Sequence, residues 1–259
     1  MSEKKDVVLE VDNLRIDIPV SAGLLHPVRG ISFDVSRGET LCIVGESGCG
    51  KSLTSLAIMG LLPKNANRQA DRLNFLGEDI RDFDERQMSK LRGVKMGMIF
   101  QEPMTSLNPS YTIGNQLEEV YLRHMSSNRL EARERAIFLL DKVGISSAGS
   151  RLGQYPHQLS GGLRQRVMIA MALMCGPDLI IADEPTTALD VTIQAQILHL
   201  LAELQSDFDM AMILITHDLG IVARVADKVQ VMYAGRTVEE GNCEAVFDKP
   251  LHPYTSGLL

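Results

Sequence analysis

The chain has 259 residues, of which 45% are hydrophobic, and its formal net charge is −7 at pH 7. A chain of this length can bury a full core, and its negative charge argues against a general nucleic-acid binder. The sequence begins without the apolar core of a signal peptide and contains no apolar run near the roughly 18 residues of a membrane span, so we expect the protein in the cytosol.

The first part of the chain predicts strands that lead into a glycine-rich turn. Apolar and polar residues partly alternate over residues 7–18 and 31–35, which is typical of half-buried antiparallel strands. The apolar run 40–44 follows, and residues 53–59 have the composition of a helix. We therefore expect a strand, a tight turn and a helix in succession.

This turn has the phosphate-loop spacing of Gly, four residues, Gly-Lys-Ser. It consists of Gly45, Glu46, Ser47, Gly48, Cys49, Gly50, Lys51 and Ser52, and Leu53 continues the helix. Such a turn points backbone N–H groups and the positive end of a helix at one place, where a triphosphate fits. Lys51 is expected to neutralise the β- and γ-phosphates, and the Ser52 hydroxyl to ligate Mg²⁺.

The middle of the chain begins with the apolar run 95–100, which predicts a core strand that delivers Gln101 to the edge of the site. The composition then changes to one that favours helices. We interpret residues 102–158 as a helical insert in an α/β core formed by residues 1–101 and 159–259.

Two later apolar runs, residues 179–182 and 211–215, predict strands that are buried on both faces of a parallel sheet. Asp183 and Glu184 follow the first run, and His217 follows the second. The strand ends of an open α/β sheet are the usual place for a site. Asp183 is expected to bind Mg²⁺ directly or through water, and Glu184 to polarise an attacking water.

A second candidate anion site lies at Ser160, Gly161 and Gly162, which precede the strongly helical stretch 164–175. Ser160 can cap this helix, and the two glycines leave its amino end bare. One chain rarely needs two such sites for one triphosphate, whereas two chains that face each other would use both.

Taken in chain order, these motifs resemble those of the ATP-binding subunit of an ABC transporter. The motifs are the phosphate loop, Gln101, Leu159-Ser-Gly-Gly162, Leu179-Ile-Ile-Ala-Asp-Glu184, Ala188-Leu-Asp190 and His217. The resemblance covers nearly the whole chain and implies one ABC ATPase domain, of α/β class. It would be a P-loop NTPase core with an N-terminal antiparallel β subdomain and an inserted helical subdomain, and it would use ATP and Mg²⁺.

The resemblance also implies roles for single residues. In a head-to-tail dimer, Ser160 and Gly162 would close over the ATP held by the partner's phosphate loop, and Asp190 would cross the interface. Gln101 would ligate Mg²⁺ and report the γ-phosphate to the membrane subunits. His217 would hold the γ-phosphate and the attacking water.

Four segments narrow the resemblance to the dipeptide, oligopeptide and nickel importers, and among them to the first of their two ATPase subunits. These segments are residues 101–109, 155–162, 184–196 and 252–255. Peptide import is then the leading function, with nickel or another small solute as the alternative. The implied partners are transmembrane permease subunits, a second ATPase subunit that is a copy or a paralogue, and, indirectly, an extracytoplasmic solute-binding protein. The resemblance places the chain peripherally at the cytoplasmic face of the inner membrane, without nucleic acid.

The chain departs from the family pattern at three places. Leu163 stands where the general family has Gln, although peptide importers often carry an apolar residue there. Members of the family usually carry an aromatic residue some twenty positions before the phosphate loop to stack on adenine, whereas this chain has Leu25 and His26 there, so adenine is expected to rest on His26 or on aliphatic packing. The sequence ends soon after residues 252–255, where relatives often continue into a cysteine-containing tail with an iron–sulfur cluster, and no cluster is expected.

Two other functions remain as hypotheses: an ABC-type ATPase that acts on DNA, and a P-loop nucleotide kinase. The first would carry a coiled-coil or zinc-bearing insertion, and the second would have no use for the second anion site. For the transporter subunit, we expect Met104 and Leu107 to fill a groove on a membrane partner. The alternative is that both side chains pack under the helical insert.

Overall fold

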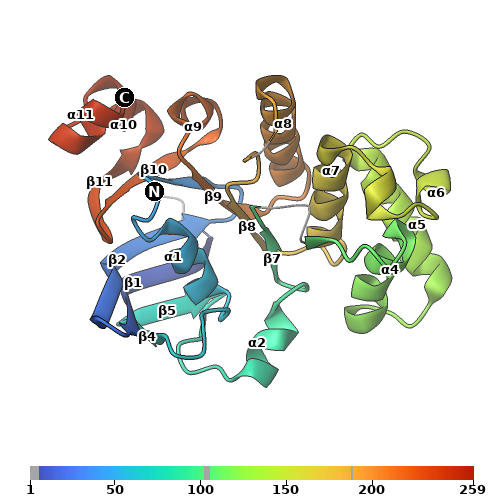
Figure 1. Ribbon diagram of the computed structural model, residues 1–259, viewed down its shortest axis with the longest axis horizontal. Coiled ribbons are helices and arrows are strands. Elements are labelled where there is room, and N and C mark those ends of the chain that lie inside the picture. Colours follow the sequence, from blue (N-terminus) through green and yellow to red (C-terminus); the bar gives the residue numbers. More distant parts are fainter. Residues whose placement is uncertain (1–5, 102–105, 188) are drawn as a thin grey trace. The chain divides into compact units, whose positions relative to one another are not determined.

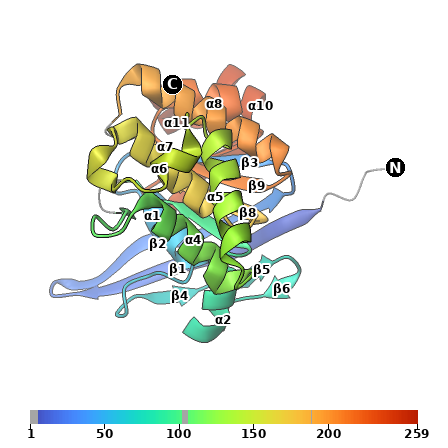
Figure 2. The ribbon, with the colours of Figure 1, turned by 90° about the vertical axis from the view of Figure 1, so that its right-hand side faces the viewer.

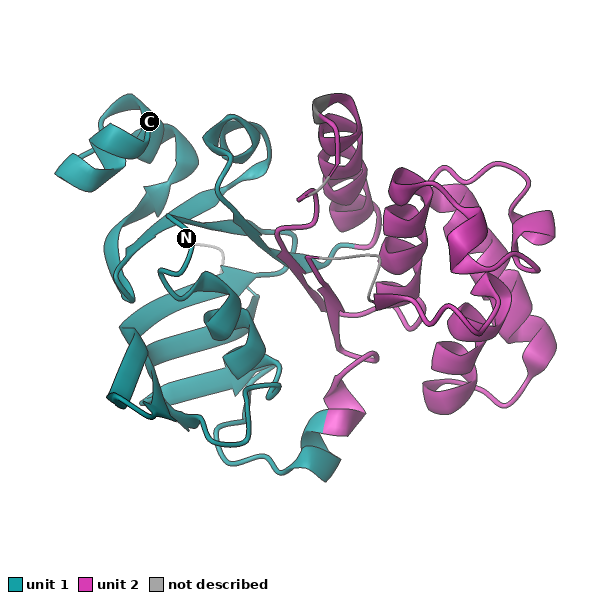
Figure 3. Ribbon diagram, viewed as in Figure 1, with its two compact units in different colours: residues 1–88, 209–259 teal, residues 89–208 magenta. Residues whose placement is uncertain are grey.

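The structure is a computed structural model that describes residues 6–101, 106–187 and 189–259. Strands and helices are mixed along the chain (Figure 1). Two compact units are distinguished in Figure 3, a first unit of residues 1–88 and 209–259 and a second unit of residues 89–208. None of the described helices is both long and apolar enough to cross a membrane.

The first unit contains an antiparallel sheet in the order β2-β1-β5-β6, with β4 paired to β1. Its strands are β1 (Val7–Val20), β2 (Gly23–Ser36), β4 (Asn67–Gln69), β5 (Arg72–Phe75) and β6 (Glu78–Asp79). The long hairpin of β1 and β2 is seen from the side in Figure 2. Alternating apolar residues of β1, such as Leu9 and Val11, are buried, which confirms the antiparallel strands predicted here.

The first unit also contains four strands in the order β11-β10-β3-β9. They are β3 (Thr40–Val44), β9 (Ala211–Thr216), β10 (Lys228–Tyr233) and β11 (Arg236–Asn242). The pairs β10–β3 and β3–β9 are parallel, and Val44 stands opposite both Val231 and Thr216. Every residue of β3 and β9 is buried, as their apolar runs predict. The segments that follow β3 and β9 therefore start side by side.

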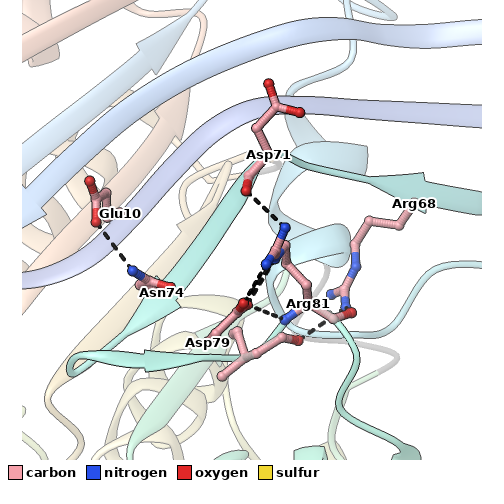
Figure 4. A network of polar contacts seen from close by, with 7 residues as sticks. Glu10, Arg68, Asp71, Asn74, Asp79 and Arg81 are labelled. Atoms are coloured by element: carbon pink, nitrogen blue, oxygen red, sulfur yellow. Dashed lines mark hydrogen bonds and ion pairs between the residues drawn. The ribbon is translucent and has the colours of Figure 1, made fainter.

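The helices of this unit are short. They are α1 (Lys51–Ile58), α9 (Leu219–Val225), α10 (Cys243–Asp248) and α11 (Pro253–Leu258), and α2 (Glu85–Leu91) begins in this unit. Arg68 fixes the end of α1, because its guanidinium donates to the carbonyl oxygens of Ala57 at 2.7 Å and Arg81 at 2.6 Å. Burial lowers the pKa of Arg68. Figure 4 shows the network in which Arg81 in turn pairs with Asp79.

The second unit contains the parallel pair β7 (Met96–Ile99) and β8 (Leu179–Asp183), with Ile99 opposite Ala182. Its helices are α4 (Ile113–His124), α5 (Arg129–Lys142), α6 (Ala148–Arg151), the 3-10 helix η1 (Pro156–Gln158), α7 (Gly161–Ala172) and α8 (Val191–Asp207). The helix-rich composition of residues 102–158 thus corresponds to α4, α5, α6 and η1, while residues 102–105 lie outside the described part of the chain.

Arg135 on α5 closes the carboxyl end of α7. Its guanidinium donates to the carbonyl oxygens of Leu173 and Met174, both at 3.2 Å, and lies 5.4 Å from the centre of the Phe138 ring. Burial lowers the pKa of Arg135. A cation at the end of a helix stabilises it, so Arg135 helps to fix α7 against α5.

The expected docking role of Leu107 is wrong. Leu107 is only 2% exposed, so it packs inside the protein and is not available on the surface for a partner. Burial of this apolar side chain in its own unit removes its surface from water, which stabilises the folded chain more than exposure would. Met104, the other residue expected at this surface, lies outside the described residues.

Candidate functional site

The phosphate loop connects β3 to α1, as the spacing of its residues predicts. Gly45 and Gly50 have φ values of 150° and 108°, which side chains rarely tolerate. A Cβ atom would lie 2.2 Å from the Met232 carbonyl oxygen at Gly45 and 2.4 Å from the Pro27 carbonyl oxygen at Gly50. The backbone of the loop is therefore closed in by neighbouring backbone, and only glycine fits at these two positions.

Lys51 lies within this loop and is only 4% exposed. Its ammonium donates to the carbonyl oxygens of Gly45 at 2.8 Å and Glu46 at 2.9 Å, and lies 3.8 Å from the Cys49 sulfur. The N-cap residue of α1 is Gly50, which has no side chain to accept from the helix amides. A buried ammonium beside a helix amino end attracts negative charge, so the loop fits a phosphate chain.

The remaining residues of the motif lie in the loop itself or in the first turn of α1. Glu46, Ser47 and Gly48 are exposed, whereas Ser52 and Leu53 form the second and third positions of α1. The amides of a first helical turn have no partner within the helix, and the Cα–Cβ bonds of its side chains tilt toward the amino end. Ser52 is thus suitably placed to help hold a cation bound to phosphates.

The two histidines expected at the nucleotide both lie in the first unit. His217 follows β9, and Thr216 of that strand stands opposite Val44, so His217 and Gly45 leave adjacent strands at the same edge. His26 precedes Pro27, whose carbonyl oxygen faces Gly50. The His26 ring is bound to Asp17, with 2.5 Å between Nδ1 and Oδ1.

In the second unit, polar side chains gather where β7 and β8 end. The Gln101 amide donates to Glu184 Oε2 at 3.3 Å, and the Thr187 hydroxyl donates to the same oxygen at 2.9 Å. Asp183 is the last residue of β8 and is 7% exposed. The strand register thus brings Gln101, Asp183 and Glu184 together, as expected for groups that follow parallel strands.

Glu184 has a left-handed backbone, with φ at 46°. The turn after it is held by two glutamines: Gln165 donates to the Pro185 carbonyl oxygen at 2.5 Å, and Gln194 donates to the Thr186 carbonyl oxygen at 3.1 Å. Gln165 is fully buried in α7. Side chains that hold an unusual backbone often mark a functional site. Sequence reasoning missed these glutamines and Thr187, and the neighbouring sequence holds no signal for Gln165, which stands between Arg164 and Arg166.

The second candidate anion site is the start of α7. Ser160 is its N-cap residue and accepts from the Leu163 amide at 3.4 Å, which confirms the predicted cap. A Cβ atom on Gly162 would lie 3.2 Å from Ile193 on α8, and Asp190 caps α8 by accepting from the Ile193 amide at 3.0 Å. The amino ends of α7 and α8 are therefore neighbours. Ser160, Gly161 and Asp190 are exposed.

Comparison with known families decides the class of protein. Residues 28–187, more than half of the chain, match the family described as ABC transporter. The chain belongs to the ABC transporter family.

Similar ABC proteins support this assignment. The dipeptide transport ATP-binding protein DppD of Bacillus subtilis is 54% identical over 97% of this chain and 76% of that protein. The oligopeptide transport ATP-binding protein OppD of the same organism is 52% identical over 97% of this chain and 71% of that protein. Both relatives are longer than the 259 residues of this chain.

Among solved structures, the ATP-binding cassette MJ0796 in a dimeric state bound to ADP and Pi has a TM-score of 0.77 and 26% identity. The alignment covers 91% of this chain and 98% of that cassette. The predicted fold class, an α/β P-loop ABC ATPase with an antiparallel β region, is confirmed. As a member of this family, the chain is an ATP-binding ATPase.

Proposed function

We propose that this ABC ATPase powers the import of dipeptides or oligopeptides through a membrane transporter. The ATPase part depends on one observation, the phosphate loop in which the buried Lys51 ammonium lies between the backbone of Gly45 and Glu46. The peptide part is supported by the names of the relatives, which are dipeptide and oligopeptide transport ATP-binding proteins.

In this proposal the phosphates of ATP lie on the amides of the loop and of the first turn of α1. The residues concerned are Gly45, Glu46, Ser47, Gly48, Cys49, Gly50, Lys51, Ser52 and Leu53. Lys51 exchanges its carbonyl partners for phosphate oxygens, a change that replaces neutral acceptors with charged ones. The adenine rests near His26.

Mg²⁺ would be held by Ser52, Gln101 and Asp183, where it neutralises charge on the phosphates. The hydroxyl, amide and carboxylate oxygens of these residues are the ligands that this hard cation prefers. Glu184 orients the attacking water and accepts its proton, while Gln101 and Thr187 fix the position of the carboxylate. His217 holds the γ-phosphate.

The working form in this proposal is a head-to-tail dimer with a second copy or a paralogue. Ser160, Gly161 and Gly162 then face the nucleotide of the other subunit, and Asp190 crosses the interface. Support comes from the exposure of Ser160 and Gly161, and from the dimeric state of the related cassette. The dimer would act at the cytoplasmic face of the membrane on permease subunits, which a solute-binding protein supplies with peptide.

The test is reconstitution of this chain with its permease subunits and second ATPase subunit in proteoliposomes. Uptake of a labelled dipeptide and release of phosphate should both require ATP with Mg²⁺ and should both be lost in Lys51→Ala. Phosphate release without peptide uptake would retain the ATPase and overturn the peptide assignment. Absence of ATP binding by the isolated wild-type chain would overturn the ATPase assignment as well.

A further inference from the structure

The segment at the carboxyl end of the first unit contacts the phosphate loop directly. The hydroxyl oxygen of Tyr254, in α11, accepts a hydrogen bond from the Glu46 amide at 3.0 Å. These two residues are 208 positions apart in the sequence. None of the roles described above uses this contact, although it lies on the loop that binds the phosphates.

The Glu46 amide shares its peptide unit with the Gly45 carbonyl, and the Lys51 ammonium binds that carbonyl at 2.8 Å. One peptide unit therefore donates to Tyr254 on one side and accepts from Lys51 on the other. Hydrogen bonds in such a chain polarise and strengthen one another. The tyrosine hydroxyl thus fixes the orientation of the peptide on which the catalytic lysine rests.

Tyr254 is itself held in place by several contacts. Its ring packs on the Tyr233 ring, with 4.6 Å between the ring centres. Its amide donates to His252 Nδ1 at 3.1 Å, and the Glu239 carboxylate accepts from the amides of Leu251 at 2.7 Å and His252 at 3.0 Å. Burial raises the pKa of Tyr254, which disfavours the phenolate form. A side chain fixed from this many sides can position the loop.

A separate contact holds the other end of the same loop. The Cys49 carbonyl oxygen accepts from the Gly235 amide at 3.0 Å, and the Gly235 carbonyl oxygen accepts from the Arg29 amide at 2.7 Å. The loop is thus fixed near Cys49 by backbone and near Glu46 by a single side chain. Only the second of these contacts can be removed by a substitution that deletes one atom.

We propose that Tyr254 is a positioning residue for ATP binding, which presets the Gly45–Glu46 peptide and thereby the phosphate loop. Residues 251–258 then tune the affinity of the site for nucleotide. The idea rests on the proposed ATPase function. A loop that is ordered before the ligand arrives loses less conformational entropy on binding, so loss of the hydroxyl lowers affinity.

The test is Tyr254→Phe, which deletes the hydroxyl and keeps the ring. A fluorescent ATP analogue titrated into the isolated chain should bind about fivefold more weakly, the loss expected for one neutral hydrogen bond. In the reconstituted transporter, KM for ATP should rise by a similar factor while kcat stays within about twofold. The matched control is Tyr233→Phe, because the Tyr233 hydroxyl makes no hydrogen bond to the described loop residues.

Hydrogen exchange without nucleotide separates positioning from general support. In Tyr254→Phe, exchange should become faster in peptides that cover residues 45–50 and stay unchanged in the strands of the antiparallel sheet. Faster exchange throughout the first unit would mean a purely structural role and would overturn the proposal. Unchanged affinity in Tyr254→Phe, or an equal loss in Tyr233→Phe, would overturn it too. If wild type binds no ATP, the ATPase function itself fails, which is a distinguishable result.

Discussion

The two units contribute candidate site residues of different kinds. In the first unit the site is mostly backbone, because Gly45 and Gly50 are closed in by carbonyl oxygens and even Lys51 rests on main-chain acceptors. In the second unit it is mostly side chains, since Gln101 and Thr187 both bind the Glu184 carboxylate.

This difference predicts that the two units respond differently to substitution. A backbone site is damaged when atoms are added, because there is no room for them. A side-chain site is damaged when a functional group is removed, even if its shape is kept. We therefore expect additions in the first unit to weaken nucleotide binding and isosteric changes in the second unit to slow hydrolysis.

The largest expected effect is that of Glu184→Gln. The amide keeps the size of the side chain but cannot accept the proton of water, so turnover should fall by about 10²–10⁴ while ATP binding persists. Steady-state phosphate release by the reconstituted transporter, measured beside nucleotide titration, checks this. Near-normal turnover would assign the role to another residue, with His217 as the first candidate.

Ser160→Arg should come next. Ser160 is exposed at the start of α7 and is proposed to serve the nucleotide of the other subunit. A bulky cation there should prevent closure and reduce hydrolysis by about 10²-fold, since small misplacements have effects of that size. The isolated chain should bind ATP normally. If binding to the isolated chain is lost as well, the proposed action across the dimer is wrong.

Gly50→Ala tests the backbone site of the first unit. Its Cβ atom would meet the Pro27 carbonyl at 2.4 Å, so nucleotide affinity should fall and unfolding should become easier by about 1–3 kcal/mol. Gly23→Ala is the matched control, because Gly23 also has a positive φ, at 135°, but has no described atom within 4 Å of the added Cβ. Chemical denaturation of both variants measures the free energy of unfolding, and nucleotide titration measures the affinity. Equal losses would show that backbone strain, and not the crowded loop, is responsible.

The smallest expected effect is that of Thr187→Ala. Removal of the hydroxyl that binds Glu184 at 2.9 Å should slow hydrolysis by several-fold, about 1 kcal/mol, with unchanged ATP affinity. Thr187→Ser should restore most of the rate, because it keeps the hydroxyl. A rate that remains low in the serine variant would mean that the methyl group, and therefore packing, matters more.

Much of the secondary structure next to the candidate site could be predicted from the sequence. The apolar runs before Gly45, Asp183 and His217 are β3, β8 and β9, all fully buried. Such runs carry a local signal, because a strand buried on both faces must be apolar throughout. The caps Ser160 and Asp190 also follow local rules.

The supports of the site could not be predicted in this way. Tyr254 reaches the phosphate loop from the far end of the chain, and Gln165 reaches the Pro185 carbonyl from inside a helix. Neither contact leaves a mark in the neighbouring sequence. The burial of Leu107 was missed for a related reason, since an apolar residue beside prolines is compatible with either a core or an interface.

The long-range contacts of the phosphate loop also have a consequence for synthesis. A ribosome makes residues 45–50 long before the segment 232–254. The loop meets its neighbours Met232, Gly235 and Tyr254 only when that segment has emerged. A growing chain that has not yet reached Tyr254 therefore lacks these contacts of the phosphate loop, and the loop is completed only after residues made long after it have emerged.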